Sequence, residues 1–235
     1  MDICTGTGSM RKQQVMGKFK PVWSVDTRGQ CRGGRRQRFI RGNLNDAKLR
    51  QRLIGLSPDF ASASVPCEDF SYANRGQKRR TKGRCTMKAV LELFAEMRQK
   101  KRHFVGMIEN PRGRMRQLAN GCLRGWTYVE ADHCMYSTTT KYKKRVDLWV
   151  RHEMARHFSL KVCVGSNCRW ARWNAYTKRW YHPQVAQAGP SVVKVGPGKY
   201  KTILGTGEYS TRIQIPSKLC ASVVWQVKRF LLSRP

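Results

Sequence analysis

Short apolar runs alternate with helical segments over the first 150 residues, and this alternation is the feature that most constrains the fold. Apolar strands are expected at residues 22–26, 38–41, 60–65, 104–108, 128–133 and 145–150. After a Thr86 cap, apolar residues recur at helical spacing: Met87, Val90, Leu91, Phe94 and Met97. This spacing predicts a helix packed on a sheet, and a similar apolar stripe after Pro216 predicts a closing helix whose stripe belongs to the core. The pattern therefore predicts an α/β sheet domain.

Two loops at the ends of predicted strands carry reactive side chains. Cys67 follows Pro66 after the run 60–65, and Glu109 follows the run 104–108. Ligand sites in open α/β sheets collect at the carboxyl ends of strands, so a thiol nucleophile and an acid/base partner could meet there around one substrate ring. The alternative is a small buried cysteine and a solvated glutamate, which are the commoner environments of these residue types.

The chain opens with a very short strand, a glycine turn and a segment, 11–17, that suits a helix closed by glycine. Gly6 and Gly8 form the turn, and the next apolar run ends on Asp26. A glycine turn lets the backbone approach a ligand closely, and an acid at a strand tip can accept hydrogen bonds from a ribose diol. The pair is consistent with a nucleotide site, although many loops need glycine for a positive φ.

Several segments occur in the order of the motifs of one family. They are Asp-Ile-Cys-Thr-Gly-Thr-Gly at 2–8, Val-Asp at 25–26, Val-Pro-Cys-Glu-Asp-Phe-Ser at 65–71, Ile-Glu-Asn-Pro at 108–111, Asp-His-Cys-Met-Tyr at 132–136 and Tyr-Lys-Lys-Arg-Val-Asp-Leu-Trp at 142–149. In this order they resemble the DNA cytosine-5 methyltransferases, particularly the short phage- and virus-type members. The resemblance covers roughly residues 1–150, and the Pro-Cys and Glu-Asn pairs are its specific part.

The resemblance implies a class I, Rossmann-like methyltransferase sheet with helices on both faces and a small irregular insertion near the C-terminus. Residues 1–150 would form the S-adenosylmethionine-binding catalytic domain, 151–212 a target-recognition segment, and 213–235 a helix packing back on the catalytic domain. The residues expected to hold the cofactor are Asp2, Gly6, Gly8, Asp26, Asn43 (or Asn45) and Pro66.

The same resemblance implies that methyl transfer to C5 of cytosine in DNA proceeds through a covalent intermediate. Cys67 would attack C6 of the ring, Glu109 would hold N3 and the exocyclic amine, and Arg145 would supply a nearby cation. Asp147 stands where the family has a second arginine, and the first strand is short. These departures, with the high charge, favour a degenerate methyltransferase fold that only binds nucleic acid; an enzyme acting on RNA cytosine is a second alternative.

The charge of the chain indicates a polyanionic partner. Lys and Arg number 47 against 14 Asp and Glu, a formal charge of +33, so we expect DNA, or RNA, to bind in a strongly salt-dependent way. No apolar run near 18 residues, basic amphipathic helix or secretory signal is evident, which predicts no membrane partner. A soluble intracellular protein is expected, in the host cytoplasm or nucleus if the chain is viral.

Cations cluster in two segments. The first cluster lies within residues 28–41, where its glycines also suit a disordered basic segment with only general affinity. The second directly follows the Pro-Cys loop: Arg75, Lys78, Arg79, Arg80, Lys82 and Arg84. In the family this stretch belongs to the loop that closes over a flipped base, where cations can hold the flanking phosphates.

Residues 169–181 interleave aromatic rings with cations. Trp170, Arg172 and Trp173 lead this segment, in which bases could stack on the rings while cations hold the phosphate backbone. The alternative is a small satellite core of tryptophans covered by arginine stems. In the family this region selects the target sequence, and its shortness here predicts that few base pairs are read.

The nine cysteines are scattered, and with no secretory signal they do not suggest a disulfide framework. The closest pair is Cys163 and Cys168, with His157 and His182 on either side. A Cys-x4-Cys turn can bind zinc, but the histidine spacing is loose. We therefore favour a hairpin turn at residues 165–167 and expect no metal.

Overall fold

A seven-stranded mixed sheet forms the centre of the computed structural model, which describes residues 1–4, 9–19, 22–27, 38–71, 82–118, 121–139, 141–186, 190–205 and 214–234. Its strands are β1 (Asp2–Ile3), β2 (Trp23–Asp26), β3 (Arg38–Arg41), β4 (Phe60–Ser64), β5 (Val105–Pro111), β6 (Trp126–Asp132) and β7 (Arg145–Arg151). Their order is β3-β2-β1-β4-β5-β7-β6. Strands β1 to β5 are parallel, and β7 is antiparallel to both β5 and β6. The predicted Rossmann-like methyltransferase sheet is confirmed.

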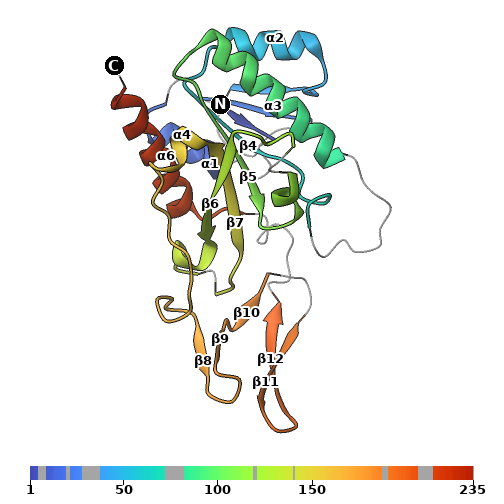
Figure 1. The fold of residues 1–235 in the computed structure, drawn as a ribbon, viewed down its shortest axis with the longest axis vertical. Helices are drawn as coiled ribbons and strands as arrows, with labels where there is room; N and C mark the ends of the chain where they lie inside the picture. Colours follow the sequence, from blue (N-terminus) through green and yellow to red (C-terminus); the bar gives the residue numbers. More distant parts are fainter. Residues whose placement is uncertain are drawn as a thin grey trace.

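Helices cover both faces of this sheet (Figure 1). The helices α2 (Ala47–Gly55) and α3 (Lys82–Lys100) pack on one face, and α1 (Ser9–Met16), α4 (His152–Ala155) and α6 (Ser217–Leu232) pack on the other. The predicted closing helix is α6, and its stripe is core as expected, since Leu219, Val223 and Val227 are fully buried. No helix in the described part of the chain is long and apolar enough to cross a membrane.

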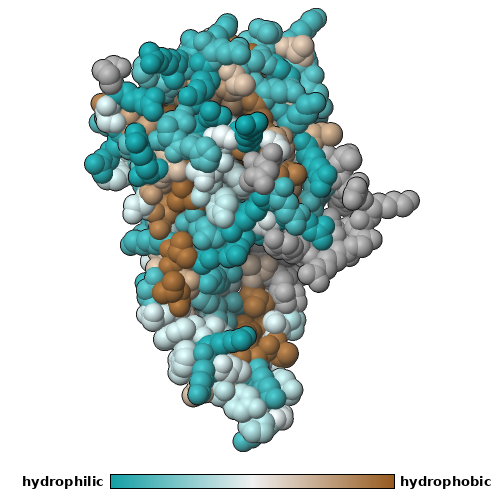
Figure 2. Space-filling view, in the orientation of Figure 1, coloured by the Kyte–Doolittle hydropathy of each residue, from teal (hydrophilic) through white to brown (hydrophobic). Residues whose placement is uncertain are grey.

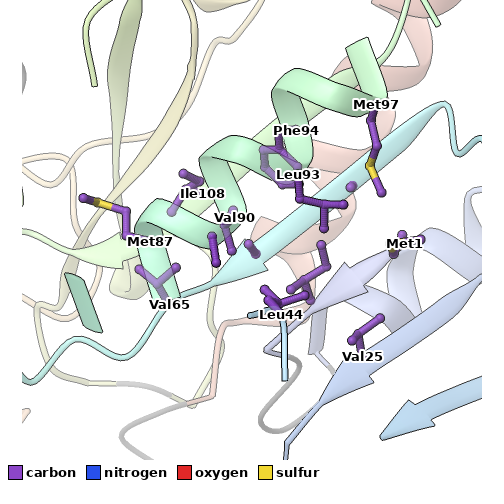
Figure 3. Packing of buried hydrophobic residues seen from close by; sticks show 14 of the residues in the cluster. Met1, Val25, Leu44, Val65, Met87, Val90, Leu93, Phe94, Met97 and Ile108 are labelled. Carbon is purple, nitrogen blue, oxygen red and sulfur yellow. The ribbon is translucent and has the colours of Figure 1, made fainter. Parts of the chain in front are cut away.

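Helix α3 packs along β4 and β5 through one continuous apolar stripe (Figure 3). Val90 and Leu93 are fully buried in it, as predicted from their spacing. The helix begins at Lys82, however, and the predicted Thr86 cap is wrong. The carboxylate of Asp69 accepts the backbone N–H groups of Gly83 (2.8 Å) and Arg84 (3.2 Å), so a residue from the Pro-Cys loop satisfies the first turn.

Short strands form a separate group at one end of the long axis of the molecule (Figure 1). The strands β8 (Arg172–Asn174) and β9 (Arg179–Tyr181) make an antiparallel hairpin, and β10 (Gln184–Val185), β12 (Lys199–Gly205) and β11 (Ser191–Gly196) make a small sheet. Residues 165–167 do form a turn, closed by the N–H of Cys168 donating to the carbonyl of Gly165 (2.9 Å). The predicted hairpin there is wrong, because the paired strands lie further along the chain.

Candidate active site

Cys67 lies at the carboxyl edge of the sheet, half-buried in the loop that follows β4. The turn after it is closed by the N–H of Phe70, which donates to the carbonyl of Cys67 (3.0 Å). The buried side chain of Asn110, at the end of β5, donates to the carbonyl of Val65 (3.1 Å). This bond ties the Pro-Cys loop to the Glu-Asn segment. That segment was predicted as a loop, but it lies within β5, because Glu109 and Asn110 pair with β7.

Helix α3 starts directly against the same loop. A Cβ atom at Gly83 would lie 2.6 Å from the carbonyl oxygen of Pro66, so only glycine allows this approach. Asp69 at the other side of the loop caps the helix through its carboxylate. The loop that carries Cys67 is therefore fixed at three points: strand β4, Asn110 and the first turn of α3.

Glu109 is buried beside this loop. It lies opposite Ser64 in the β4–β5 register, and the Ser64 hydroxyl donates a hydrogen bond to its carboxylate. Burial raises the pKa of Glu109 above its ordinary value, against the opposing effects of the nearby Lys144 charge and the Ser64 hydrogen bond. A carboxyl group with a raised pKa is suited to holding or giving a proton close to neutral pH.

The thiol of Cys67 is electrostatically coupled to Glu109. Burial is the main cause that raises the pKa of Cys67, and the negative charge of Glu109 raises it further, whereas Lys144 lowers it. An ionised Glu109 therefore disfavours the thiolate of Cys67. Neutralising Glu109, by a proton or by a partner that donates to it, removes one obstacle to forming the thiolate.

Lys144 is the cation that acts on both groups, and the sequence did not single it out. Leu148 of β7 lies opposite Glu109, and side chains alternate along a strand, so Lys144 continues the side of β7 that faces Glu109. The sequence signal that could have identified Lys144 is its position one residue before Arg145, in a run of three cations.

Arg145 is directed to the other side of β7. Its guanidinium pairs with the fully buried carboxylate of Asp132, at 2.7 Å between Nη2 and Oδ2. The next residue on that side, Asp147, is paired by Arg116 of the short helix η1 (Arg114–Leu118), at 2.6 and 2.8 Å. The structure therefore does not bring Arg145 to Cys67 and Glu109, and Arg116 supplies the cation beside Asp147.

Three of the predicted cofactor residues, Asp26, Asn43 and Pro66, lie along one edge of the parallel sheet. Asp26 ends β2 and is partly buried, exposed Asn43 follows β3 and uses its side-chain oxygen to accept the N–H of Asn45 (3.1 Å), and partly buried Pro66 follows β4. Asp2 is buried within the sheet, where its carboxylate accepts the hydroxyl of Ser62 (2.9 Å). Gly6 and Gly8 lie outside the described residues.

The predicted nucleic-acid contacts fall into two groups. Arg84 is exposed near the start of α3, where Lys82 is the first residue; Arg75, Lys78, Arg79 and Arg80 lie outside the described residues. Trp173 and Trp180 are 52 % and 42 % exposed and meet edge to face at 5.4 Å between ring centroids. Arg172 is also exposed, whereas Trp170 is half-buried and donates its indole N–H to the carbonyl of Ser137 (3.1 Å). Trp173 and Trp180 are thus surface rings, not a buried satellite core.

Comparison with known proteins gives likeness of structure alone. No protein-family model and no curated protein sequence matches the chain. Solved structures similar to it include a variant of Spodoptera frugiperda DNMT2 (15 % identity, TM-score 0.45, covering 64 % of this chain and 49 % of that one) and S. pombe Dnmt2 methyltransferase (12 %, 0.47, 69 % and 51 %). A third is a protein assigned as a DNA modification methyltransferase and encoded within an E. coli prophage (12 %, 0.48, 84 % and 60 %).

The chain spans between about half and three fifths of the length of these three solved proteins. At TM-scores below 0.5 the likeness adds nothing to what the strand order already shows.

Proposed function

We propose that this chain is a DNA (cytosine-5) methyltransferase that uses Cys67 as its nucleophile and S-adenosylmethionine as its methyl donor. The observation that carries the proposal is the pairing of Cys67 and Glu109 at adjacent parallel strand ends, tied together by the Asn110 hydrogen bond to Val65. A thiol and a proton-holding carboxyl group at one sheet edge are what addition to a pyrimidine ring requires.

The sheet edge fits the cofactor. The helices that follow β1 and β4, α1 and α3, lie on opposite faces of the sheet, so a crevice is expected between these two neighbouring strands. Asp26 at the tip of β2 would accept hydrogen bonds from a ribose diol, and Pro66 would contact the other end of the cofactor. When bound, S-adenosylmethionine supplies an electrophilic methyl group.

The chain's own residues would act in sequence. The Cys67 thiolate adds to C6, forming a sulfur–carbon bond while the C5–C6 π electrons move to C5 and the ring; Glu109 places a proton on N3, which stabilises the charge. C5 would then take the methyl group, which leaves S-adenosylhomocysteine. A base would remove the C5 proton, the electron pair of that bond would expel the thiolate, and N3 would return its proton to Glu109. Lys144 favours the thiolate at the start and end of this cycle.

The residues beyond the catalytic part would contact the target. We infer that residues 151–212 form a recognition segment on the catalytic domain of residues 1–150, and that residues 213–235 close that domain through α6. The exposed rings of Trp173 and Trp180, beside exposed Arg172 and Arg179, support contact with bases and phosphates.

A labelled-methyl transfer assay on duplex DNA tests the chemistry. Cys67→Ser should abolish transfer and leave DNA binding intact, because a hydroxyl is not nucleophilic enough at neutral pH. Cys122→Ser, which changes an exposed cysteine, is the control and should retain activity. A duplex containing 5-fluorocytosine should trap the wild-type chain covalently, since fluorine at C5 cannot leave as a proton does. Substantial activity in Cys67→Ser would overturn the covalent mechanism.

A specific observation supports the alternative that the chain only binds nucleic acid. Burial and Glu109 both raise the pKa of Cys67, and Arg145 is committed to Asp132 instead of the thiol. A formal charge of +33 suits a polyanion-binding module. Calorimetry with S-adenosylmethionine separates the two candidates, because a module with no cofactor site gives no binding heat. Offering RNA in the methyl transfer assay tests the RNA-directed alternative.

A further inference from the structure

Three cysteines and one histidine meet away from the Cys67 site. The sulfur atoms of Cys134, Cys163 and Cys168 and a ring nitrogen of His182 all lie within 4.8 Å of one another. The Nε2 atom of His182 is 3.4 Å from the sulfur of Cys168 and 3.7 Å from that of Cys163. All three cysteines are buried and unbridged, and His182 is 9 % exposed.

These distances match a tetrahedral zinc site. With Zn–S bonds of about 2.3 Å and Zn–N bonds of about 2.0–2.1 Å, tetrahedral angles place sulfur and nitrogen ligands about 3.6 Å apart and two sulfurs about 3.8 Å apart. The two sulfur–nitrogen distances lie on either side of that value. Three thiolates and an imidazole form a ligand set that zinc uses in structural sites, in which no position remains open for a substrate.

The backbone around the cysteines is shaped for a metal. The sulfur of Cys163 accepts the backbone N–H of Gly165, two residues further on, and Gly165 has a φ of +93°. A Cβ atom at Gly165 would also lie 2.2 Å from the ring of Trp180, so both the turn and its packing require glycine. The side chain of Asn167 closes the loop by accepting the N–H of Val164 (3.0 Å) and donating to the carbonyl of Val162 (2.9 Å).

The groups that surround the cluster hold it in place and balance its charge. Asp132 accepts the N–H of Cys163 (2.7 Å), while Lys143 donates to the carbonyl of the same residue (2.8 Å). A zinc ion with three thiolates and one neutral imidazole carries one net negative charge. Lys143 and Arg145, which also approaches that carbonyl, are cations placed to stabilise it.

Neither a disulfide nor an apolar core accounts for all four residues. One disulfide would leave a third thiol and the imidazole without a role. As an apolar cluster, the four would bury a polar ring nitrogen among sulfur atoms, which are weak hydrogen-bond partners. Apart from Ala171, the buried members of this hydrophobic cluster are the three cysteines themselves, with Met135 and Trp170 packed against them, so the apolar core of this part of the chain is small.

We propose that Cys134, Cys163, Cys168 and His182 bind one structural Zn²⁺ that fastens the segment carrying β8 and β9 to the end of β6. Cys134 belongs to the short helix η2 (His133–Met135) after β6, the other cysteines flank the Gly165 turn, and His182 follows β9. The ion would thus set the position of Trp173 and Trp180 relative to the sheet. This site replaces the expectation of no metal drawn from the sequence, and it does not depend on methyltransferase activity.

Metal analysis of the purified full-length chain tests the proposal. The wild type, expressed with zinc and purified without chelators, should hold about one zinc ion per chain, measured by inductively coupled plasma mass spectrometry. Cys168→Ser and His182→Ala should lose most of it, whereas Cys122→Ser, which changes an exposed cysteine, should keep it. Undiminished zinc in both ligand variants would overturn the site, as would equal loss in Cys122→Ser.

Cobalt substitution of the wild type keeps the test valid if a ligand variant fails to fold. Co²⁺ added to the metal-stripped chain should give the intense visible absorption of tetrahedral coordination and the thiolate charge-transfer band, and Zn²⁺ should displace both. A wild-type chain that is folded by circular dichroism, holds negligible zinc and shows neither band would refute the proposal.

Discussion

At the scale of single residues, the candidate active site depends on one buried carboxyl group. Glu109 has a raised pKa because it is buried, and it acts in turn on the pKa of Cys67. The protonated form is the one the fold favours, so its stabilising effect is present at low pH and is lost as pH rises through the folded-state pKa. Burying Glu109 therefore lowers the stability of the fold at higher pH, but it provides a group that can hold a proton.

Glu109→Gln should remove that pH dependence. The amide keeps the shape of the carboxyl group and a partner for Ser64, but it never ionises. The variant should therefore melt at the same temperature as the wild type at about pH 4 and roughly 2–4 °C higher at about pH 8. This shift is what ~1 kcal/mol gives in a chain of this size. Thermal melting across pH measures this, with exposed Glu68→Gln as the control. If the difference in melting temperature between Glu109→Gln and the wild type does not change with pH, ionisation of Glu109 does not destabilise the fold.

Asp26→Ala tests the cofactor edge at the same scale. If the carboxylate holds ribose hydroxyls, the variant should bind S-adenosylmethionine more weakly by about 1–3 kcal/mol at unchanged DNA affinity. Asp59→Ala is a matched control, because Asp59 precedes β4 at the opposite edge of the sheet and pairs with Lys101 (2.6 Å). Equal cofactor affinity in the wild type and Asp26→Ala, measured by calorimetry, would remove Asp26 from the site.

At the scale of elements, the Pro-Cys loop and helix α3 are one unit. Asp69 caps α3 from the loop, and Gly83 allows the helix to start against Pro66. A cap satisfies backbone donors that no helical carbonyl can reach. Here the same contacts also fix the segment that holds Cys67, so helix stability and nucleophile position are linked.

Asp69→Ala should therefore lower both stability and activity. Losing the cap should cost about 1 kcal/mol in urea unfolding and loosen the loop around Cys67. Asp46→Ala removes the corresponding cap from α2, where Asp46 accepts the N–H of Lys48 (2.8 Å), and should cost similar stability without affecting methyl transfer. If both variants lose activity to the same extent, the loss follows from stability alone.

The β8–β9 hairpin offers a second test among the elements. Because Trp173 is exposed, Trp173→Ala should leave the melting temperature within about 2 °C of the wild type, as surface substitutions usually change stability by less than about 0.5 kcal/mol. If its ring stacks on bases, binding measured over a panel of DNA sequences should change in preference with little change in salt dependence. An unchanged preference would mean that this ring does not contact bases.

At the scale of the whole molecule, positive charge dominates the surface. Figure 2 shows hydrophilic residues over most of the visible face, with apolar residues in smaller patches. If the chain binds DNA as we propose, a formal charge of +33 should make the logarithm of the affinity fall steeply with the logarithm of salt concentration, because each neutralised phosphate releases counterions. Such binding would place the chain on DNA before any base is recognised.

Neutralising Arg79, Arg80 and Lys82 together should weaken binding to all DNA sequences about equally. The salt slope should become shallower by up to roughly three units if these cations follow the Pro-Cys loop onto phosphates. Neutralising three exposed cations elsewhere, Lys48, Arg52 and Lys88 of α2 and α3, tests whether the loss of any three positive charges changes the salt slope equally. An equal effect from both triples would assign the slope to overall charge and not to this loop.

The sequence by itself determined the secondary structure and which segments carry the candidate catalytic residues. Periodicity placed the strands and the closing helix within a few residues, because apolar side chains must alternate in strands and recur every three or four positions in helices. The segments that carry Cys67 and Glu109 could be predicted to meet, because the carboxyl ends of parallel strands share one edge, although Glu109 lies within β5 and not in a loop after it.

Only the tertiary structure decided what depends on register and on distant contacts. Whether Lys144 or Arg145 acts on Glu109 follows from the pairing of β7 with β5, since a shift of one residue exchanges the two sides of a strand. Asp69 caps α3, which begins 13 residues later in the chain, so the cap could not be found from the residues next to the start of the helix. The Cys134, Cys163, Cys168 and His182 cluster draws on residues 48 positions apart, and folding alone brings such ligands within bonding range of one ion.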